Sequence, residues 1–119
     1  MKNINVEKIN NEVTKFIEDR DWDQFHSIKN LSMALSVETS ELVEIFQWLK
    51  EDESNNVSEN PKMKLKVEEE IADIFVYLLR IATKSNIDIE DVVLAKIKKN
   101  AEKYPVEKAK GSAKKYTDL

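Results

Sequence analysis

Two pairs of carboxylates, each with a spacing of three residues, lie within the two most apolar stretches of the chain. Glu38 and Glu41 form the first pair, and Glu70 and Asp73 form the second. On a helix this spacing places both acids on one face, with Cβ atoms about 5 to 6 Å apart. Two helices that turn such faces toward each other would gather four carboxylates. Such a cluster favours a hard divalent cation, above all Mg2+, whose remaining positions take water or phosphate.

Two of these acids stand where a hydrophobic side chain is expected. Asp73 is the only side chain ionised at neutral pH in IADIFVYLL, residues 71 to 79, and Glu38 falls on the apolar seam of its own helix. Because burying an unpaired carboxylate is very costly, we expect a cation to neutralise them. The alternative is that helical acids form a solvated face, which is the expected state of Glu68 and Glu69.

Other metals fit this composition less well. Zinc prefers His and Cys ligands, and the chain has one His and no Cys. A di-iron bundle requires Glu-x-x-His pairs, and the chain contains none. Magnesium, with manganese as a substitute, remains the expected ion.

The elements that must position these acids are helices. The 119 residues are 35% charged and 41% apolar, with one Gly and two Pro, which favours an all-α fold resembling a four-helix bundle. The expected helices cover residues 4 to 19, 30 to 50, 61 to 84 and 88 to 103, and residues 51 to 60 are expected to form a polar linker. Asn60 is the expected N-cap before Pro61, Asn86 a left-handed helix stop and Asp88 the cap of the last helix. With no Cys and no apolar run long enough for a membrane span or signal sequence, we expect a cytoplasmic protein that binds no membrane.

The apolar periodicity assigns a seam to each of the two acid-bearing helices. In the third helix Glu70, Asp73 and Tyr77 are expected to border the seam rather than to belong to it. The seam of the second helix is Leu31, Leu35, Glu38, Leu42, Ile45 and Leu49, and that of the third is Val67, Ile71, Ile74, Leu78 and Ile81.

The C-terminal end carries a concentration of positive charge. Eight lysines and two glutamates lie between Lys96 and Lys115, whereas the whole chain has a net charge of −4. Such an end suits anionic phosphates, while the net charge argues against a nucleic-acid polymer as partner. Because Gly111 is the only glycine, a Gly-rich phosphate loop is excluded. We expect one domain over residues 1 to 105 and a lysine-rich tail over residues 106 to 119.

Aromatic side chains near the acids suggest a surface for a flat base. Trp48 lies ten residues after Glu38, and Tyr77 lies one turn after Asp73. Both can border the acidic cluster and stack on a base. The alternative is that they belong to the core, as most helical aromatics do.

Three blocks of the sequence carry a family resemblance. They are residues 20 to 49, which include the ExxE motif and the QW pair; residues 69 to 82, which include EExxD; and residues 96 to 105, which end in KYP. Together they resemble the MazG-like all-α nucleoside triphosphate pyrophosphohydrolases, especially the dCTP pyrophosphatase branch.

The resemblance implies specific roles for residues of this chain. It makes Glu38, Glu41, Glu70 and Asp73 the Mg2+ ligands. Val37 and Ser40 depart from the residues common in relatives, which bears on helix packing near the metal. The implied nucleotide pocket comprises Trp22, His26, Asn30, Trp48 and Tyr77, and the implied phosphate or sugar contacts are Lys96 and Asn100.

The implied reaction is attack of water on the α-phosphorus of a nucleoside triphosphate, which releases the monophosphate and pyrophosphate. Either Glu38 or Glu41 would orient or deprotonate that water. The expected substrate is dCTP or a modified pyrimidine deoxynucleotide. The alternatives are dUTP, a broad set of triphosphates, or a non-catalytic helical interaction module. Wide apolar helix faces predict a homodimer or homotetramer.

Overall fold

The computed structural model describes all 119 residues, Met1 to Leu119, and every regular element in it is helical. The predicted all-α fold is therefore confirmed. The chain forms two compact units, Met1–Ser85 and Asn86–Leu119, which we describe separately. The predicted division into residues 1 to 105 and 106 to 119 stays a prediction. No helix is both long enough and apolar enough to cross a membrane.

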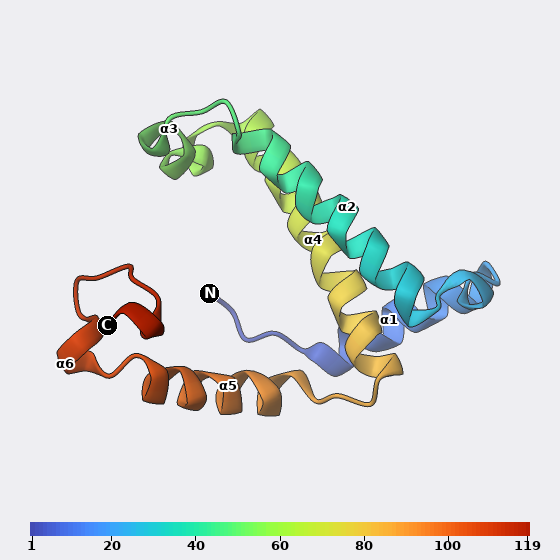
Figure 1. Cartoon of the computed structure of the whole chain (residues 1–119). Coiled ribbons are helices and arrows are strands. Elements are labelled where there is room, and N and C mark those ends of the chain that lie inside the picture. The colour runs from blue at the N-terminus through green and yellow to red at the C-terminus, as the bar shows by residue number, and fades with distance from the viewer. The chain divides into compact units, whose positions relative to one another are not determined.

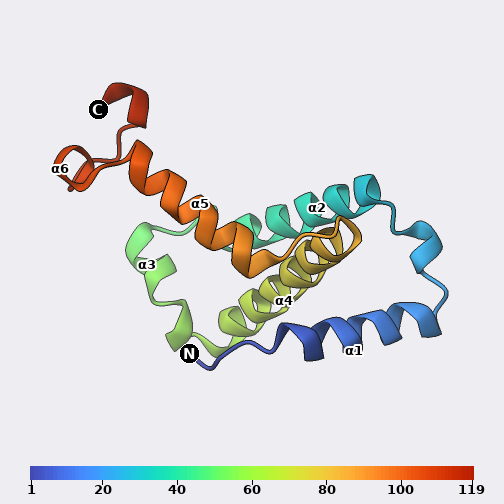
Figure 2. The same ribbon diagram turned by 90° about the horizontal axis from the view of Figure 1, so that it is seen from below.

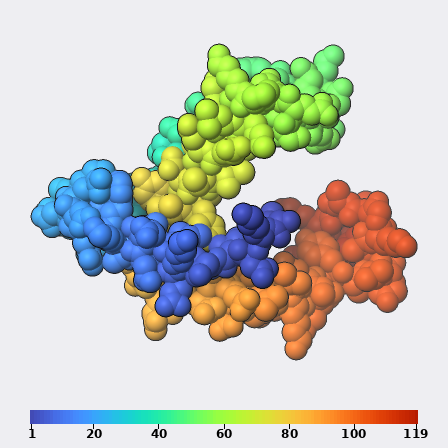
Figure 3. Space-filling model, turned by 180° about the vertical axis from the view of Figure 1, so that it is seen from behind, coloured from blue at the N-terminus to red at the C-terminus, as the bar shows by residue number.

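The first unit contains three long helices and three short helical segments (Figure 1). α2 and α4 run antiparallel and pack along their length, as Figure 2 also shows from below. The space-filling view shows α1 against the C-terminal half of α4 only, where α4 is coloured yellow (Figure 3). The bounds are α1 (Val6–Asp19), η1 (Asp23–Phe25), α2 (Ile28–Phe46), α3 (Glu51–Asn55), η2 (Val57–Glu59) and α4 (Pro61–Lys84).

The second unit begins with a left-handed residue, Asn86, whose φ is 54°. Asn tolerates this conformation better than most residues, as expected for a helix stop. α5 covers Ile89–Lys103, α6 covers Val106–Ala109 and η3 covers Tyr116–Asp118. The ring of Tyr116 packs edge-on against Tyr104, with centroids 6.0 Å apart, so the end of the chain folds onto the end of α5.

Side-chain caps begin each long helix. The Asn60 side chain accepts a hydrogen bond from the Met63 backbone N–H, and Pro61 occupies the first helical position, as predicted. Asp88 caps α5 in the same way through the Asp91 N–H. The second helix starts two residues earlier than predicted, because Ser27 caps it, and it ends at Phe46 instead of residue 50. The linker expected after it contains α3 and η2.

The seam of α2 is as predicted, but the seam of α4 is rotated. Ile71 and Leu78, which were assigned to the core, are 55% and 44% exposed. Glu70 and Tyr77 are half-buried instead. The half-buried seam of α4 is Met63, Val67, Glu70, Ile74, Tyr77 and Ile81, with the same 4, 3, 4, 3, 4 steps as the α2 seam. In both seams the third position is a glutamate, so each helix presents an acid to the other.

The core of this unit lies where α1, α2 and α4 meet. Leu31 is 1% exposed and is its most deeply buried large side chain. We expect Leu31→Ala to lower the free energy of unfolding by about 2 to 5 kcal/mol, because it removes buried contacts and leaves a cavity. Chemical denaturation measures this. The matched change Leu94→Ala, at a position 60% exposed on α5, should cost within about 0.5 kcal/mol. Equal losses in both variants would contradict this core.

Candidate active site between α2 and α4

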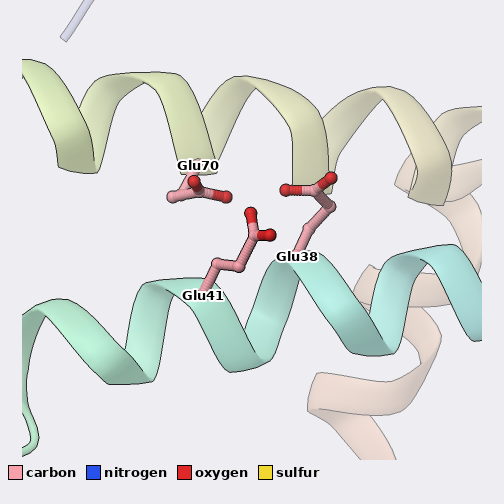
Figure 4. A group of neighbouring side chains, drawn as sticks. All are labelled: Glu38, Glu41 and Glu70. Carbon is pink, nitrogen blue, oxygen red and sulfur yellow. The ribbon is translucent and has the colours of Figure 1, made fainter.

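Three carboxylates from two helices converge in the α2–α4 seam (Figure 4). Glu38 and Glu41, one turn apart on α2, point toward α4, and Glu70 points back from α4. One oxygen from each lies within 4.8 Å of the others. The helices that bear them are antiparallel and closely packed. The acids meet because each occupies a position on the face that its helix turns toward the other.

This acidic cluster, Glu38, Glu41 and Glu70, has no compensating charge within the chain. The Oε2 atoms of Glu38 and Glu70 are buried and have no hydrogen-bond partner. The ion pairs of the chain involve other acids, namely Asp19, Asp23 and Glu68. Burying polar oxygens without partners is costly, so the cluster calls for a positively charged ligand.

The electrostatics of Glu38 reflect this crowding. Sharing of the Glu38 proton with the adjoining Glu70 carboxylate, followed by burial and then by Glu41 and Asp73, raises the pKa of Glu38 from 4.5 to about 7. The negative charges disfavour a further one, so one acid retains its proton near neutral pH. A divalent cation would relieve the same repulsion.

The donor set indicates which ions fit. All three groups offer carboxylate oxygens, with no thiolate or imidazole among them, which suits a hard cation such as Mg2+ or Mn2+. Since Mg2+ ligands lie at about 2.0 to 2.1 Å from the ion, the three carboxylates must draw slightly closer together to share one. The residues therefore fit a divalent metal.

Asp73 is placed differently from the prediction. The structure leaves it exposed, although it lies within the most apolar stretch of the sequence. The reason is that α4 buries only the faces toward α2 and α1, and Asp73 opens onto a cleft beside them. It stands one turn after Glu70 and its charge raises the pKa of both Glu38 and Tyr77. The premise that burial of Asp73 demands a cation is wrong; the buried, unpartnered acids are Glu38 and Glu70.

The cleft onto which Asp73 opens has a volume of about 770 Å3. That is within the range of roughly 300 to 1,000 Å3 common for small-molecule sites. We call it the aromatic cleft. It brings together three residues of the predicted nucleotide pocket, namely Trp22, His26 and Tyr77. Its full lining is Glu12, Val13, Lys15, Phe16, Ile17, Asp19, Arg20, Trp22, His26, Asp73, Val76, Tyr77 and Arg80.

One wall of the aromatic cleft went unrecognised in the sequence. The Phe16 ring meets the Trp22 ring edge-on, with centroids 5.6 Å apart. The Arg20 guanidinium lies 3.7 Å from the Phe16 centroid and donates a hydrogen bond to the Phe16 carbonyl. The i, i+4 spacing of Phe16 and Arg20 could have indicated this contact from the sequence, because side chains at that spacing meet on one face of a helix. This arrangement fixes one edge of the Trp22 ring.

A second cleft opens beside the acidic cluster toward the N-terminal end of α4. We call it the lysine cleft. Glu41 and Glu70 belong both to the acidic cluster and to the lining of this cleft. Lys62 and Lys66 supply positive charge to the cleft. Its full lining is Glu41, Glu44, Ile45, Asn60, Lys62, Met63, Lys66, Glu69 and Glu70.

The remaining predicted site residues are not gathered at these clefts. Asn30 donates a hydrogen bond from its side chain to the Phe25 carbonyl and so braces the turn before α2. Trp48 lies beyond the end of α2 and is 89% exposed. Lys96 and Asn100 belong to α5 in the second unit. Their roles in nucleotide binding stay predictions.

The raised pKa of Glu38 predicts a pH-dependent stability in the metal-free protein. Between about pH 4.5 and 7 the folded state retains a proton that the unfolded chain has lost. The free energy of unfolding should therefore fall as pH rises through this window, with the full loss above about pH 7. Urea denaturation across this range measures it. Glu38→Gln should remove this component and the exposed control Glu68→Gln should keep it; identical profiles for all three would refute the crowding.

Comparisons with known proteins identify the family of this chain. The MazG-like family model matches residues 33–119, which include all four predicted metal ligands. The dCTP pyrophosphatase 1 of Bos taurus is 41% identical over 105 residues, and that of Homo sapiens is 37% identical. The match covers 88% of this chain and 62% of each mammalian protein, so the chain spans less than two thirds of their length.

A solved structure has the same fold. The crystal structure of a pyrophosphatase from Archaeoglobus fulgidus is 38% identical, with a TM-score of 0.79. The match covers 88% of this chain and 96% of that one. The resemblance inferred from the ExxE, EExxD and KYP elements is confirmed by all three comparisons, and the chain belongs to the MazG-like family.

Proposed function

We propose that this protein is a metal-dependent nucleoside triphosphate pyrophosphohydrolase. It would cleave a triphosphate to the monophosphate and pyrophosphate, with Mg2+ as the resident ion and Mn2+ as a substitute. The observation that carries the proposal is the pair of buried, unpartnered oxygens of Glu38 and Glu70, set beside Glu41 between two clefts. Relatives named pyrophosphatases, at 37 to 41% identity, support it.

The acidic cluster would do the chemistry. A divalent cation held there supplies charge to neutralise phosphate oxygens and lowers the pKa of an attacking water. Glu38 and Glu41 would hold that water, and one of them would accept its proton. Asp73, one turn along α4, would complete the ligand set from the side of the aromatic cleft.

The aromatic cleft would receive the base. Trp22 and Tyr77 offer flat faces for stacking. Burial, followed by the charges of Arg80 and Lys84, lowers the pKa of His26, which keeps its imidazole neutral at neutral pH. A neutral imidazole both donates and accepts hydrogen bonds, as the polar edge of a pyrimidine requires. Because the mammalian relatives are named dCTP pyrophosphatases, we propose dCTP or a modified pyrimidine deoxynucleotide as substrate.

A homodimer or homotetramer is also proposed. On α2 and α4 several large apolar side chains are more than half exposed, among them Val37, Val43, Leu65 and Ile71. Large apolar side chains exposed in this number on two neighbouring helices support a face that binds another subunit.

Loss of the acidic cluster should abolish turnover without unfolding the chain. We expect Glu38→Gln and Glu70→Gln each to lower kcat/KM for dCTP by roughly 100-fold or more, because each removes charge that the metal needs. Product analysis by ion-exchange chromatography and circular dichroism measure activity and fold. The control is Glu68→Gln, which changes an exposed glutamate on α4 close to Glu70. Full activity in EDTA, or release of inorganic phosphate instead of pyrophosphate, would contradict the proposal.

The preferred substrate is identified by comparing the hydrolysis rates of different nucleoside triphosphates. We expect kcat/KM for dCTP to exceed the values for dUTP, dTTP and the purine triphosphates, because the mammalian relatives are named dCTP pyrophosphatases. Equal rates with all triphosphates would favour the broad-specificity alternative. No turnover and no Mg2+-dependent nucleotide binding by calorimetry would favour a helical interaction module.

The proposed assembly has its own test. Light scattering at micromolar concentration should give a mass at least twice that of one 13.8 kDa chain, since the exposed apolar faces of α2 and α4 would be covered. Ile71→Glu, at a position 55% exposed, should weaken the association. A monomer would overturn the assembly but leave the chemistry unaffected.

A further inference from the structure

Arg80 is the one charged residue buried in the chain, and the proposed chemistry makes no use of it. It is 6% exposed and lies on α4 beside the buried Leu79, one helical turn before Lys84. A guanidinium in such a place is costly unless an acid pairs with it. Its partner is therefore a required part of the structure.

That partner is Asp23, which is far away in the sequence. One oxygen of Asp23, Oδ1, accepts a hydrogen bond from Arg80 Nη2 at 2.7 Å and another from Lys84 Nζ at 3.0 Å. The Arg80 side chain is 8% exposed and that of Lys84 is 26% exposed, whereas that of Asp23 is 61% exposed, so the pair joins a buried guanidinium to a carboxylate at the surface. Both cations lower the pKa of Asp23, Lys84 most strongly. Charge-assisted bonds of this kind are among the strongest that a side chain makes.

Asp23 belongs to the turn that carries two residues of the aromatic cleft. It opens η1, directly after Trp22, and His26 follows the end of η1. The backbone N–H of Trp22 donates to the Ile17 carbonyl, and that of His26 donates to the Asp23 carbonyl. These bonds shape the turn and tie it to α1. The only hydrogen bonds from the turn to α4 are those of Asp23.

We propose that Arg80 and Lys84 are positioning residues, which through Asp23 hold the turn and the side chains of Trp22 and His26 against α4 at the width that a base requires. The proposal rests on the proposed function in so far as the cleft binds a nucleotide. Arg80 and Tyr77 line the same cleft on α4. The Asp23 bonds thus set the separation between Trp22 on one wall and Tyr77 on the other.

A purely structural ion pair makes different predictions from a positioning one. If the pair only stabilises the fold, its loss lowers the unfolding midpoint but leaves nucleotide affinity and Trp22 emission unchanged. If the pair positions the wall, KM rises while kcat changes little, because the acidic cluster that performs the chemistry lies elsewhere, between α2 and α4. The local signals of His26 and Trp22 also change without nucleotide.

The experiment compares Asp23→Ala, Asp23→Glu and Lys84→Met with the control Lys64→Met, which breaks an exposed pair of the same helix, Lys64 with Glu68 at 3.8 Å. His26 is the only histidine, so its NMR resonances are unambiguous. Trp22 fluorescence is read in a Trp48→Phe background. KM and kcat for dCTP are then measured, with circular dichroism confirming that each variant is folded.

We expect Asp23→Ala to raise KM by roughly 10-fold or more, with kcat within about threefold, because misplaced binding groups lose orientation. Lys84→Met should raise KM by a smaller factor, Asp23→Glu should recover most of the loss, and Lys64→Met should match the wild type. The His26 and Trp22 signals should change in the same order.

Unchanged KM together with unchanged His26 and Trp22 signals in folded variants would overturn the positioning role. If Asp23→Ala fails to fold, Lys84→Met decides, because it keeps the Arg80 bond and removes only one cation. A wild-type protein without turnover would refute the proposed function instead. In that case Trp22 fluorescence, which needs no nucleotide, still decides whether Asp23 holds the turn.

Discussion

The seam between α2 and α4 holds two carboxylate oxygens, one from Glu38 and one from Glu70, that are buried and accept no hydrogen bond. The rest of the first unit is arranged around this unfavourable contact. Two apolar seams with identical spacing press the helices together, and each seam carries a glutamate where the regular pattern calls for a hydrophobic side chain. Packing elsewhere along the helices offsets the electrostatic cost. A site that is destabilised without its ligand is suited to bind a cation.

The buried positive charge of this unit, that of Arg80, differs from the buried acids because it has an ion-pair partner. Arg80 is 6% exposed, comparable with the apolar core, and it is paired at 2.7 Å with Asp23, which Lys84 also contacts. The paired charges join a turn to a helix, whereas the three carboxylates of the acidic cluster form no ion pair within the chain. The contrast separates a structural role for charge from a chemical one, because unpaired acids can bind a cation.

The antiparallel packing of α2 and α4 also explains why two different clefts flank the acidic cluster. α1 covers only the C-terminal half of α4 (Figure 3), and α1 and the turn after it add Phe16 and Trp22 there. The N-terminal half of α4 lacks that cover and presents Lys62 and Lys66. A flat, partly apolar group and a charged group would therefore find complementary surfaces on opposite sides of the carboxylates.

The sequence by itself determined the helical class, the caps at Asn60 and Asp88, the seam position of Glu38 and the family, because these depend on local spacing and residue type. It misjudged Asp73, Ile71 and Leu78, since an apolar stretch does not reveal which of its faces another helix will cover. Only the tertiary structure decided that Glu70 takes the seam position, that Phe16 and Arg20 support Trp22, and that Asp23 pairs with Arg80 across 57 residues. The physical reason is that burial and pairing of charge depend on contacts between segments, and helical periodicity constrains each segment only with respect to itself.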